Sequence, residues 1–175
     1  MGMWHTIIKQ IDHGDYLLRG SRYKFMYVST DKKRGGIKVS RVIYITNLDK
    51  EKLQRLIGVE KEFHAAKDEY LQALEYELER AVIIQPEEIP EDVITMHSQV
   101  LLRDLDYNEQ MAYTLVYPDE ADVTEDKISV LAPIGTAILG YRVGDMVEWK
   151  IPNGTVRLRV EKILYQPEAS GNFEL

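Results

Sequence analysis

The hydrophobic pattern of this chain changes its period near residue 85, and that change requires two kinds of structure in series. Before this point, apolar residues recur at helical spacing: Tyr70, Leu71, Leu74, Leu78 and Ala81. From Val93 onward, apolar residues alternate with polar ones, which is typical of strands. Between the two patterns lies Gln85–Pro90, whose prolines prevent a helix from continuing. The chain is therefore expected to join a helical segment to a β-rich module, an α+β arrangement.

The helical segment is expected to form a short antiparallel hairpin, a small coiled coil. Its first helix is predicted from about Asp49 to Ile57, capped by Asn47 or Asp49 and ended by Gly58. Its second helix is predicted from Ala65 to Ile83. Because the connection between them is short, the two helices should lie antiparallel. At ~1.5 Å per residue, the first helix would span about 14 Å and the second roughly 28 Å.

Strands are expected on both sides of this hairpin. The β-branched run Val42–Thr46 precedes it. Runs of alternating polarity follow it: Gln99–Asp104, Met111–Tyr117, Lys127–Leu131, Met146–Ile151 and Thr155–Tyr165. Asn153-Gly154 predicts a hairpin turn between the last two runs, because both residues tolerate a positive φ. Pro133 and Gly140 bound a short apolar helix, so an antiparallel sheet is expected to embrace one short helix.

Charge is divided unevenly along the chain. Residues 1–40 carry eight Lys or Arg against three Asp, a balance of +5, whereas the remainder carries 14 basic and 26 acidic residues, a balance of −12. Binding to phosphate depends on basic side chains that release counterions, so the acidic remainder is expected to bind protein rather than nucleic acid. Residues 1–40 are predicted to be a basic, poorly ordered extension, with short strands at Thr6–Ile11 and Tyr23–Val28. The alternative is a basic arm that makes weak contact with nucleic acid.

The residues that are missing exclude several kinds of chemistry. The chain has no cysteine, which rules out disulfides and thiolate catalysis and fits a reducing cytoplasm. It has no glycine-rich phosphate loop, no paired histidines and no calcium-site spacing among its carboxylates. It has no apolar run of the roughly 18 residues that a membrane helix needs. We expect no catalytic residue, no metal, no cofactor and no membrane contact, and a monomeric cytoplasmic protein.

Short motifs between Asp119 and Tyr165 resemble the C-terminal domain of the Gre transcript-cleavage factors. They follow one another at the spacing of that family: Glu120-Ala121-Asp122, Ser129 with Pro133, Gly135 to Gly140, Val143-Gly144-Asp145 and Pro152-Asn153-Gly154. So many matches at this spacing are specific to that family. The resemblance implies an FKBP-like domain over residues 86–175, and docking of that domain on RNA polymerase.

Other residues are similar to a group of smaller Gre relatives, the regulators of nucleoside diphosphate kinase (Rnk). Thr136 stands where Gre proteins usually carry a basic residue, and Trp149 precedes Ile151-Pro152. The segments Asp92–Ser98 and Leu115–Pro118 also follow the Rnk pattern. The resemblance covers about residues 41–175, with the hairpin at 41–85, and leaves residues 1–40 outside it.

Gre factors use two acidic residues at the tip of a long coiled coil to hold a catalytic Mg²⁺, which activates water. The acidic residues near the tip of the present hairpin are Glu60, Glu62, Asp68 and Glu69. They do not follow the Gre pattern, an Asp and a Glu three apart within Gly-Asp-Leu-x-Glu-Asn-Ala. A hairpin of the predicted length is also short for reaching a buried active site. We therefore expect a regulator that competes with Gre factors for the secondary channel region of polymerase without stimulating cleavage.

Two alternatives remain open. One is a true transcript-cleavage factor that acts through the tip carboxylates. The other is a peptidyl-prolyl isomerase, because Gre C-terminal domains resemble that fold. Its proline pocket would be lined by four aromatic residues: Tyr113, Tyr117, Tyr141 and Trp149.

The polymerase-docking surface is predicted on the small helix and the strand before it. Its residues are Asp122, Ser129, Leu131, Pro133 and Ile134. An exposed apolar patch beside acidic residues suits a basic or mixed helix on a partner protein. The alternative is that Leu131 and Ile134 simply belong to the core.

Overall fold

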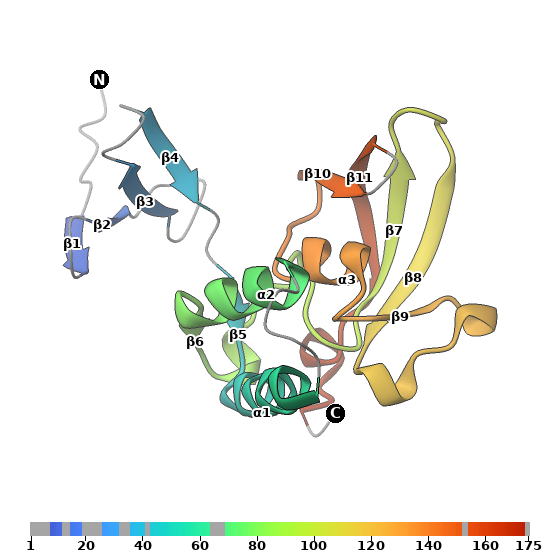
Figure 1. Cartoon of the computed structure of the whole chain (residues 1–175), viewed down its shortest axis with the longest axis horizontal. Helices are drawn as coiled ribbons and strands as arrows, with labels where there is room; N and C mark the ends of the chain where they lie inside the picture. Colours follow the sequence, from blue (N-terminus) through green and yellow to red (C-terminus); the bar gives the residue numbers. More distant parts are fainter. Residues whose placement is uncertain are drawn as a thin grey trace. The chain divides into compact units, whose positions relative to one another are not determined.

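The computed structural model describes residues 8–11, 15–18, 26–31, 36–40, 43–63, 69–151 and 154–173. The chain divides into two compact units, Met1–Val42 and Ile43–Leu175, which are described separately (Figure 1). In the described residues, no helix is long and apolar enough to span a membrane.

The first unit contains an antiparallel sheet with the strand order β1-β2-β3-β4. Its strands are β1 (Ile8–Ile11), β2 (Asp15–Leu18), β3 (Met26–Asp31) and β4 (Gly36–Ser40). The two strands predicted in this segment overlap β1 and β3. Asp31 pairs with Gly36 across the β3–β4 connection. The basic residues of the predicted arm at positions 32–34 lie outside the described residues.

The second unit begins with the helical hairpin. A short strand, β5 (Tyr44–Ile45), leads into α1 (Asn47–Phe63), and α2 (Glu69–Glu79) leads into β6 (Val82–Ile83). The strands β5 and β6 pair in parallel. The amide of Val82 donates to the carbonyl of Ile43 at 2.8 Å, and this pairing ends the second helix at Glu79 rather than at the predicted Ile83.

The prediction that Gly58 ends the first helix is wrong, because α1 continues to Phe63. A Cβ at position 58 would meet nothing within 4 Å, so packing does not require the glycine. A glycine inside a helix costs about 1 kcal/mol relative to alanine. The buried Leu53 and Ile57 outweigh that cost, since burying such a side chain contributes about 1.5–3 kcal/mol.

Helix α1 is capped by Thr46, and not by Asn47 or Asp49 as predicted. The Thr46 hydroxyl oxygen accepts from the amide of Asp49 at 3.0 Å. The same hydroxyl donates to Asp49 Oδ2 at 2.9 Å. The two residues thus satisfy each other in the manner of a capping box, with an aspartate at the third helical position. Both side chains are buried, which already sets this helix start apart from an exposed cap.

The β-rich part of the second unit is a sheet with the order β10-β11-β7-β8-β9 (Figure 1). Its strands are β7 (Gln99–Asp104), β8 (Gln110–Val116), β9 (Lys127–Ser129), β10 (Met146–Ile151) and β11 (Gly154–Tyr165). Neighbouring strands are antiparallel, as expected, except that β9 runs parallel to β8. Two short 3₁₀ turns, Pro118–Glu120 and Val123–Glu125, occupy the crossover and return the chain in its original direction.

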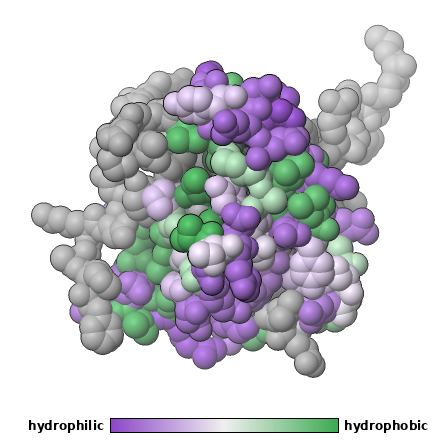
Figure 2. All heavy atoms as spheres, turned by 90° about the vertical axis from the view of Figure 1, so that its right-hand side faces the viewer, coloured by the Kyte–Doolittle hydropathy of each residue, from purple (hydrophilic) through white to green (hydrophobic). Residues whose placement is uncertain are grey.

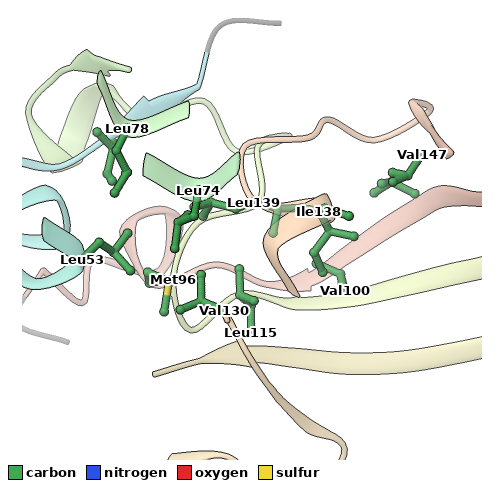
Figure 3. Packing of buried hydrophobic residues seen from close by; sticks show 14 of the residues in the cluster. Leu53, Leu74, Leu78, Met96, Val100, Leu115, Val130, Ile138, Leu139 and Val147 are labelled. Atoms are coloured by element: carbon green, nitrogen blue, oxygen red, sulfur yellow. The ribbon is translucent and has the colours of Figure 1, made fainter. Parts of the chain in front are cut away.

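A short helix, α3 (Pro133–Ile138), packs against the sheet and extends the core into the hairpin. Figure 3 shows Leu53 of α1 and Leu74 of α2 beside Met96, and Val100, Leu115 and Ile138 further along the same cluster. Thr136 is buried in α3, and its hydroxyl donates to the carbonyl of Val130 at 2.7 Å. The fold is α+β, and one core joins the hairpin to the sheet.

Candidate functional site

The crossover between β8 and β9, residues 118–126, carries Asp122 of the predicted docking surface, and we call it the docking loop. Asp122 caps the second 3₁₀ turn of this loop, accepting from the amide of Thr124 at 2.8 Å and from its hydroxyl at 2.7 Å. These hydrogen bonds, with the nearby Lys127, hold the pKa of Asp122 below its ordinary value. The loop therefore presents a carboxylate that stays ionised through the physiological range.

The next turn, between β9 and α3, carries the other four residues of the predicted docking surface. Ser129 Oγ accepts from the amide of Leu131 at 3.1 Å. The Ser129 carbonyl accepts from the amide of Ala132 at 3.0 Å, which brings Pro133 to the start of α3. The backbone of Asp122 pairs with Lys127, the first residue of the three-residue strand β9. Asp122 thus lies beside one end of this strand, and Ser129 is the residue at its other end.

Leu131 and Ile134 are both half-buried and pack against the hydrophobic core. Each therefore has one side in the core and part of its surface accessible to a partner. Pro133 and Ser129 are also half-buried, whereas Asp122 is exposed.

Val123 belongs beside this surface, although the sequence analysis did not select it. Its side chain is 91% exposed, directly after Asp122. Figure 2 views the side of the molecule that carries the docking loop and shows apolar residues set among hydrophilic ones. The sequence did contain a signal for Val123, since it is an apolar residue within a run of carboxylates. An apolar side chain gains nothing from exposure to water, so such a residue indicates a binding surface.

The tip carboxylates are divided between described and undescribed residues. Glu60 is half-buried and Glu62 exposed in the last turns of α1. Lys61 between them pairs with Glu75 of α2 at 2.5 Å. Asp68 and the side chain of Glu69 lie outside the described residues. Among the residues that are described, no three acidic or histidine side chains are arranged to hold a metal ion by themselves.

The length of the hairpin also differs from the prediction. Helix α1 has 17 residues and α2 has 11. At ~1.5 Å per residue they span about 26 Å and about 17 Å, so the first helix is nearly twice as long as predicted.

A cluster of polar residues, some buried and some partly exposed, lies where α1 meets the β-rich part, and no sequence pattern predicted it. We call it the junction network; its members are Thr46, Asp49, Thr95, His97, Tyr117, Glu120 and Glu168. The Tyr117 hydroxyl donates to Asp49 Oδ1 at 2.9 Å. His97 Nε2 lies 2.8 Å from Glu120 Oε2, and the hydroxyl of Thr95 donates to Glu168 Oε2 at 2.8 Å.

Burial and neighbouring charges shift the pKa values of this network in opposite directions. Burial, reinforced by the nearby Asp49 carboxylate, strongly raises the pKa of Tyr117, so its hydroxyl keeps its proton and remains a donor. Burial also raises the pKa of Glu168. Burial alone would raise the pKa of Glu120, but the hydrogen bond from His97 and its charge lower it overall.

The aromatic residues considered for a proline pocket are used in packing instead. Tyr113, Tyr117 and Tyr141 pack against the hydrophobic core, and the hydroxyl of Tyr117 is bound to Asp49. The side chain of Trp149 lies outside the described residues. The described aromatic residues thus give no support to a peptidyl-prolyl isomerase site.

The raised pKa of Glu168 predicts a stability effect that depends on pH. The folded chain holds this proton more tightly than the unfolded chain does, so ionisation of Glu168 above its ordinary pKa of about 4.5 destabilises the fold. Glu168→Gln, which still accepts from Thr95, is expected to raise the melting temperature at pH 7 and to change it little at pH 4. Melting curves of both proteins between pH 4 and pH 7 measure this.

The exposed Glu91 provides a control for this comparison. Glu91→Gln should leave the melting temperature close to that of the wild type across the range. A stabilisation by Glu168→Gln that is the same at pH 4 and pH 7 would contradict the assignment.

Comparison with known proteins agrees with this architecture. The family model described as the Rnk N-terminus matches residues 41–84. The model for the C-terminal part of transcription elongation factors GreA/GreB matches residues 89–165. Together they cover the hairpin and most of the β-rich part.

Individual relatives and a solved structure point the same way. The chain is 42% identical over 134 residues to the regulator of nucleoside diphosphate kinase of Escherichia coli K12, across 76% of this chain and 96% of that protein. It is 43% identical over 108 residues to the transcription elongation factor GreA of Chloroherpeton thalassium, across 58% and 68% of the two chains. The structure of a prokaryotic transcription elongation factor GreA/GreB from Nitrosomonas europaea matches with a TM-score of 0.61 and 40% identity, across 70% of this chain and 99% of that one. The chain therefore belongs to the Rnk regulators, within the family that shares the C-terminal domain of GreA and GreB.

Proposed function

We propose that this chain is a transcription regulator that binds RNA polymerase, occupies the site that Gre factors use, and does not stimulate transcript cleavage. Membership of the Rnk and GreA/GreB family supports a role in transcription. Polymerase binding is inferred from the docking surface, and the lack of cleavage from the hairpin tip.

The proposal of polymerase binding is based mainly on the composition of the predicted docking surface. This surface combines the ionised Asp122 and the exposed Val123 with the accessible parts of Leu131, Pro133 and Ile134. The docking loop carries three further exposed carboxylates, Asp119, Glu125 and Asp126, of which Glu125 pairs with Lys127. Apolar side chains beside negative charge complement a partner surface that is apolar and basic.

The hairpin supports regulation without cleavage. A cleavage factor must bring a pair of carboxylates to the polymerase active site to position a metal ion. Here the tip sequence lacks the Gre pattern of an Asp and a Glu three apart. A hairpin of this kind can fill the channel and exclude a Gre factor while adding no metal ligand of the Gre type.

A competition experiment tests the proposal. Immobilised RNA polymerase is saturated with the purified chain, and a GreA factor is added in increasing amounts. Mutual displacement is expected, because both proteins would use one site. In parallel, the chain is added to a backtracked elongation complex, where it should leave the transcript 3′ end intact and slow the cleavage that GreA stimulates.

Three outcomes would count against the proposal. Failure of polymerase to capture the chain would remove its first part. Capture without mutual displacement would show that the two proteins use different sites. Shortening of the transcript by the chain alone would favour a cleavage factor that acts through Glu60, Glu62, Asp68 or Glu69.

A further inference from the structure

The junction network connects the start of the hairpin to the docking loop by directional hydrogen bonds. At one end, Asp49 in the first turn of α1 is only 6% exposed. Its Oδ2 accepts from the hydroxyl of Thr46 at 2.9 Å, and its Oδ1 accepts from the hydroxyl of Tyr117 at 2.9 Å. The second bond crosses from the hairpin to the residue that follows β8.

At the other end, the same tyrosine is held by the docking loop. The amide of Tyr117 donates to Glu120 Oε2 at 3.3 Å, and that oxygen also lies 2.8 Å from His97 Nε2. The rings of Tyr117 and His97 lie 5.5 Å apart between centroids. Glu120 is two residues before Asp122, so the network ends at the docking surface.

Other contacts between the hairpin and the β-rich part are the apolar cluster that contains Leu53, Leu74 and Met96, and the cation–π contacts of Lys52 with Tyr117 and of Arg142 with Tyr44. Apolar contacts are non-directional, so they hold two elements together without defining one angle between them. A hydrogen bond to a buried carboxylate is directional, and leaving such an oxygen without its donor costs about 1–3 kcal/mol or more. The Asp49–Tyr117 bond therefore penalises rotation of the hairpin that the apolar core would tolerate.

We propose that the Asp49–Tyr117 hydrogen bond fixes the orientation of the helical hairpin relative to the docking surface, and that Tyr117 is a positioning residue. Its consequence for polymerase rests on the proposed function: a chain docked through the β9–α3 turn would direct its hairpin along one path only. The orientation itself is a property of the free protein and is measurable without polymerase.

The absence of cysteine makes that measurement direct. Cysteines replace Glu62, an exposed residue near the end of α1, and Lys162, an exposed residue of β11. Both receive nitroxide labels, and pulsed electron paramagnetic resonance gives the distribution of distances between them. The doubly labelled protein is expected to give one narrow distribution. Tyr117→Phe in the same background is expected to widen it at least twofold or to add a second distance.

A matched control lies on the neighbouring strand. Tyr113 of β8 also packs against the core, but its hydroxyl contacts Met111 Sδ at 3.6 Å and not the hairpin. Tyr113→Phe removes the same oxygen atom and should leave the distribution narrow. An unchanged distribution in Tyr117→Phe, or equal widening in both variants, would overturn the proposal.

A second pair of variants covers the case in which Tyr117→Phe fails to fold. Asp49→Asn keeps an oxygen that accepts from Tyr117 and a group that can hydrogen-bond to Thr46, so its distribution should remain narrow. Asp49→Ala keeps neither and should widen it. Equal distributions in these two folded variants, as judged by near-ultraviolet circular dichroism, would also overturn the proposal.

The effect on polymerase is a separate readout. Tyr117→Phe leaves the docking surface unchanged, so polymerase should capture it as well as the wild type, whereas its inhibition of GreA-stimulated cleavage should fall several-fold. If polymerase fails to capture the wild-type chain, the proposed function is contradicted. The distance measurement on the free protein would still be valid. Full inhibition by a variant with a widened distribution would show that hairpin orientation does not matter on polymerase.

Discussion

Gly135→Ala is expected to destabilise the second unit by about 3 kcal/mol or more, the upper end of the cost of overpacking a core. A Cβ at this position would lie 2.0 Å from the carbonyl oxygen of Ser129, 2.9 Å from its carbon and 3.1 Å from the Cα of Val130. All three atoms are backbone, so β9 or α3 must move to admit a methyl group. Denaturant unfolding followed by circular dichroism measures the loss.

Gly58→Ala is the matched control, because it makes the same substitution in another helix. Position 58 has open space where its Cβ would be. The variant should gain roughly 0.5–1 kcal/mol, since alanine has the higher helix propensity. The two substitutions should therefore shift the unfolding midpoint in opposite directions. If Gly135→Ala unfolds at the same denaturant midpoint as the wild type, then α3 does not lie against Ser129 as described.

Pro133→Arg is expected to weaken capture by RNA polymerase at least tenfold, which corresponds to about 1.4 kcal/mol. Pro133 is the first residue of α3, at the centre of the docking surface, and an arginine there places a charge in the apolar part of the proposed interface. The first position of a helix tolerates residues other than proline, because its amide needs no partner within the helix. The fold should thus be retained, and a polymerase pull-down with a melting curve tests both statements.

Tyr107→Arg controls for the added charge. Tyr107 is 79% exposed in the turn between β7 and β8, away from the β9–α3 turn. This variant should be captured like the wild type. Normal capture of Pro133→Arg would refute the assignment of the docking surface, and equal loss in both variants would attribute the effect to net charge.

Signals that act over a few residues predicted their structures correctly. Pro133 begins α3, and Gly140 adopts a φ of +74° just after the helix, in the region that favours glycine. Strands β10 and β11 form the predicted hairpin, although Ile151 pairs with Gly154, so Gly154 lies in the strand and not in the turn. Such motifs work because the geometry they impose is decided by their own backbone.

Signals that depend on distant partners misled the sequence analysis. Gly58 has a poor intrinsic propensity for helix, but the packing of Leu53 and Ile57 carries α1 past it. Val82 continues a helical pattern, yet it pairs with β5, a strand nearly 40 residues earlier, because the edge of β5 offers its backbone a partner. The parallel direction of β9 depends on how the docking loop folds, and periodicity does not encode direction.

The sequence by itself determined the α+β class and the family, because motifs of fixed spacing carry that information along the chain. Only the tertiary structure decided how the hairpin is held. Asp49 and Tyr117 are 68 residues apart and meet at 2.9 Å, and Thr95 and Glu168 are 73 residues apart and meet at 2.8 Å. Polar residues carry no periodic signal that reveals such pairs. Burial makes these bonds strong, and burial exists only once the core has brought the hairpin and the sheet together.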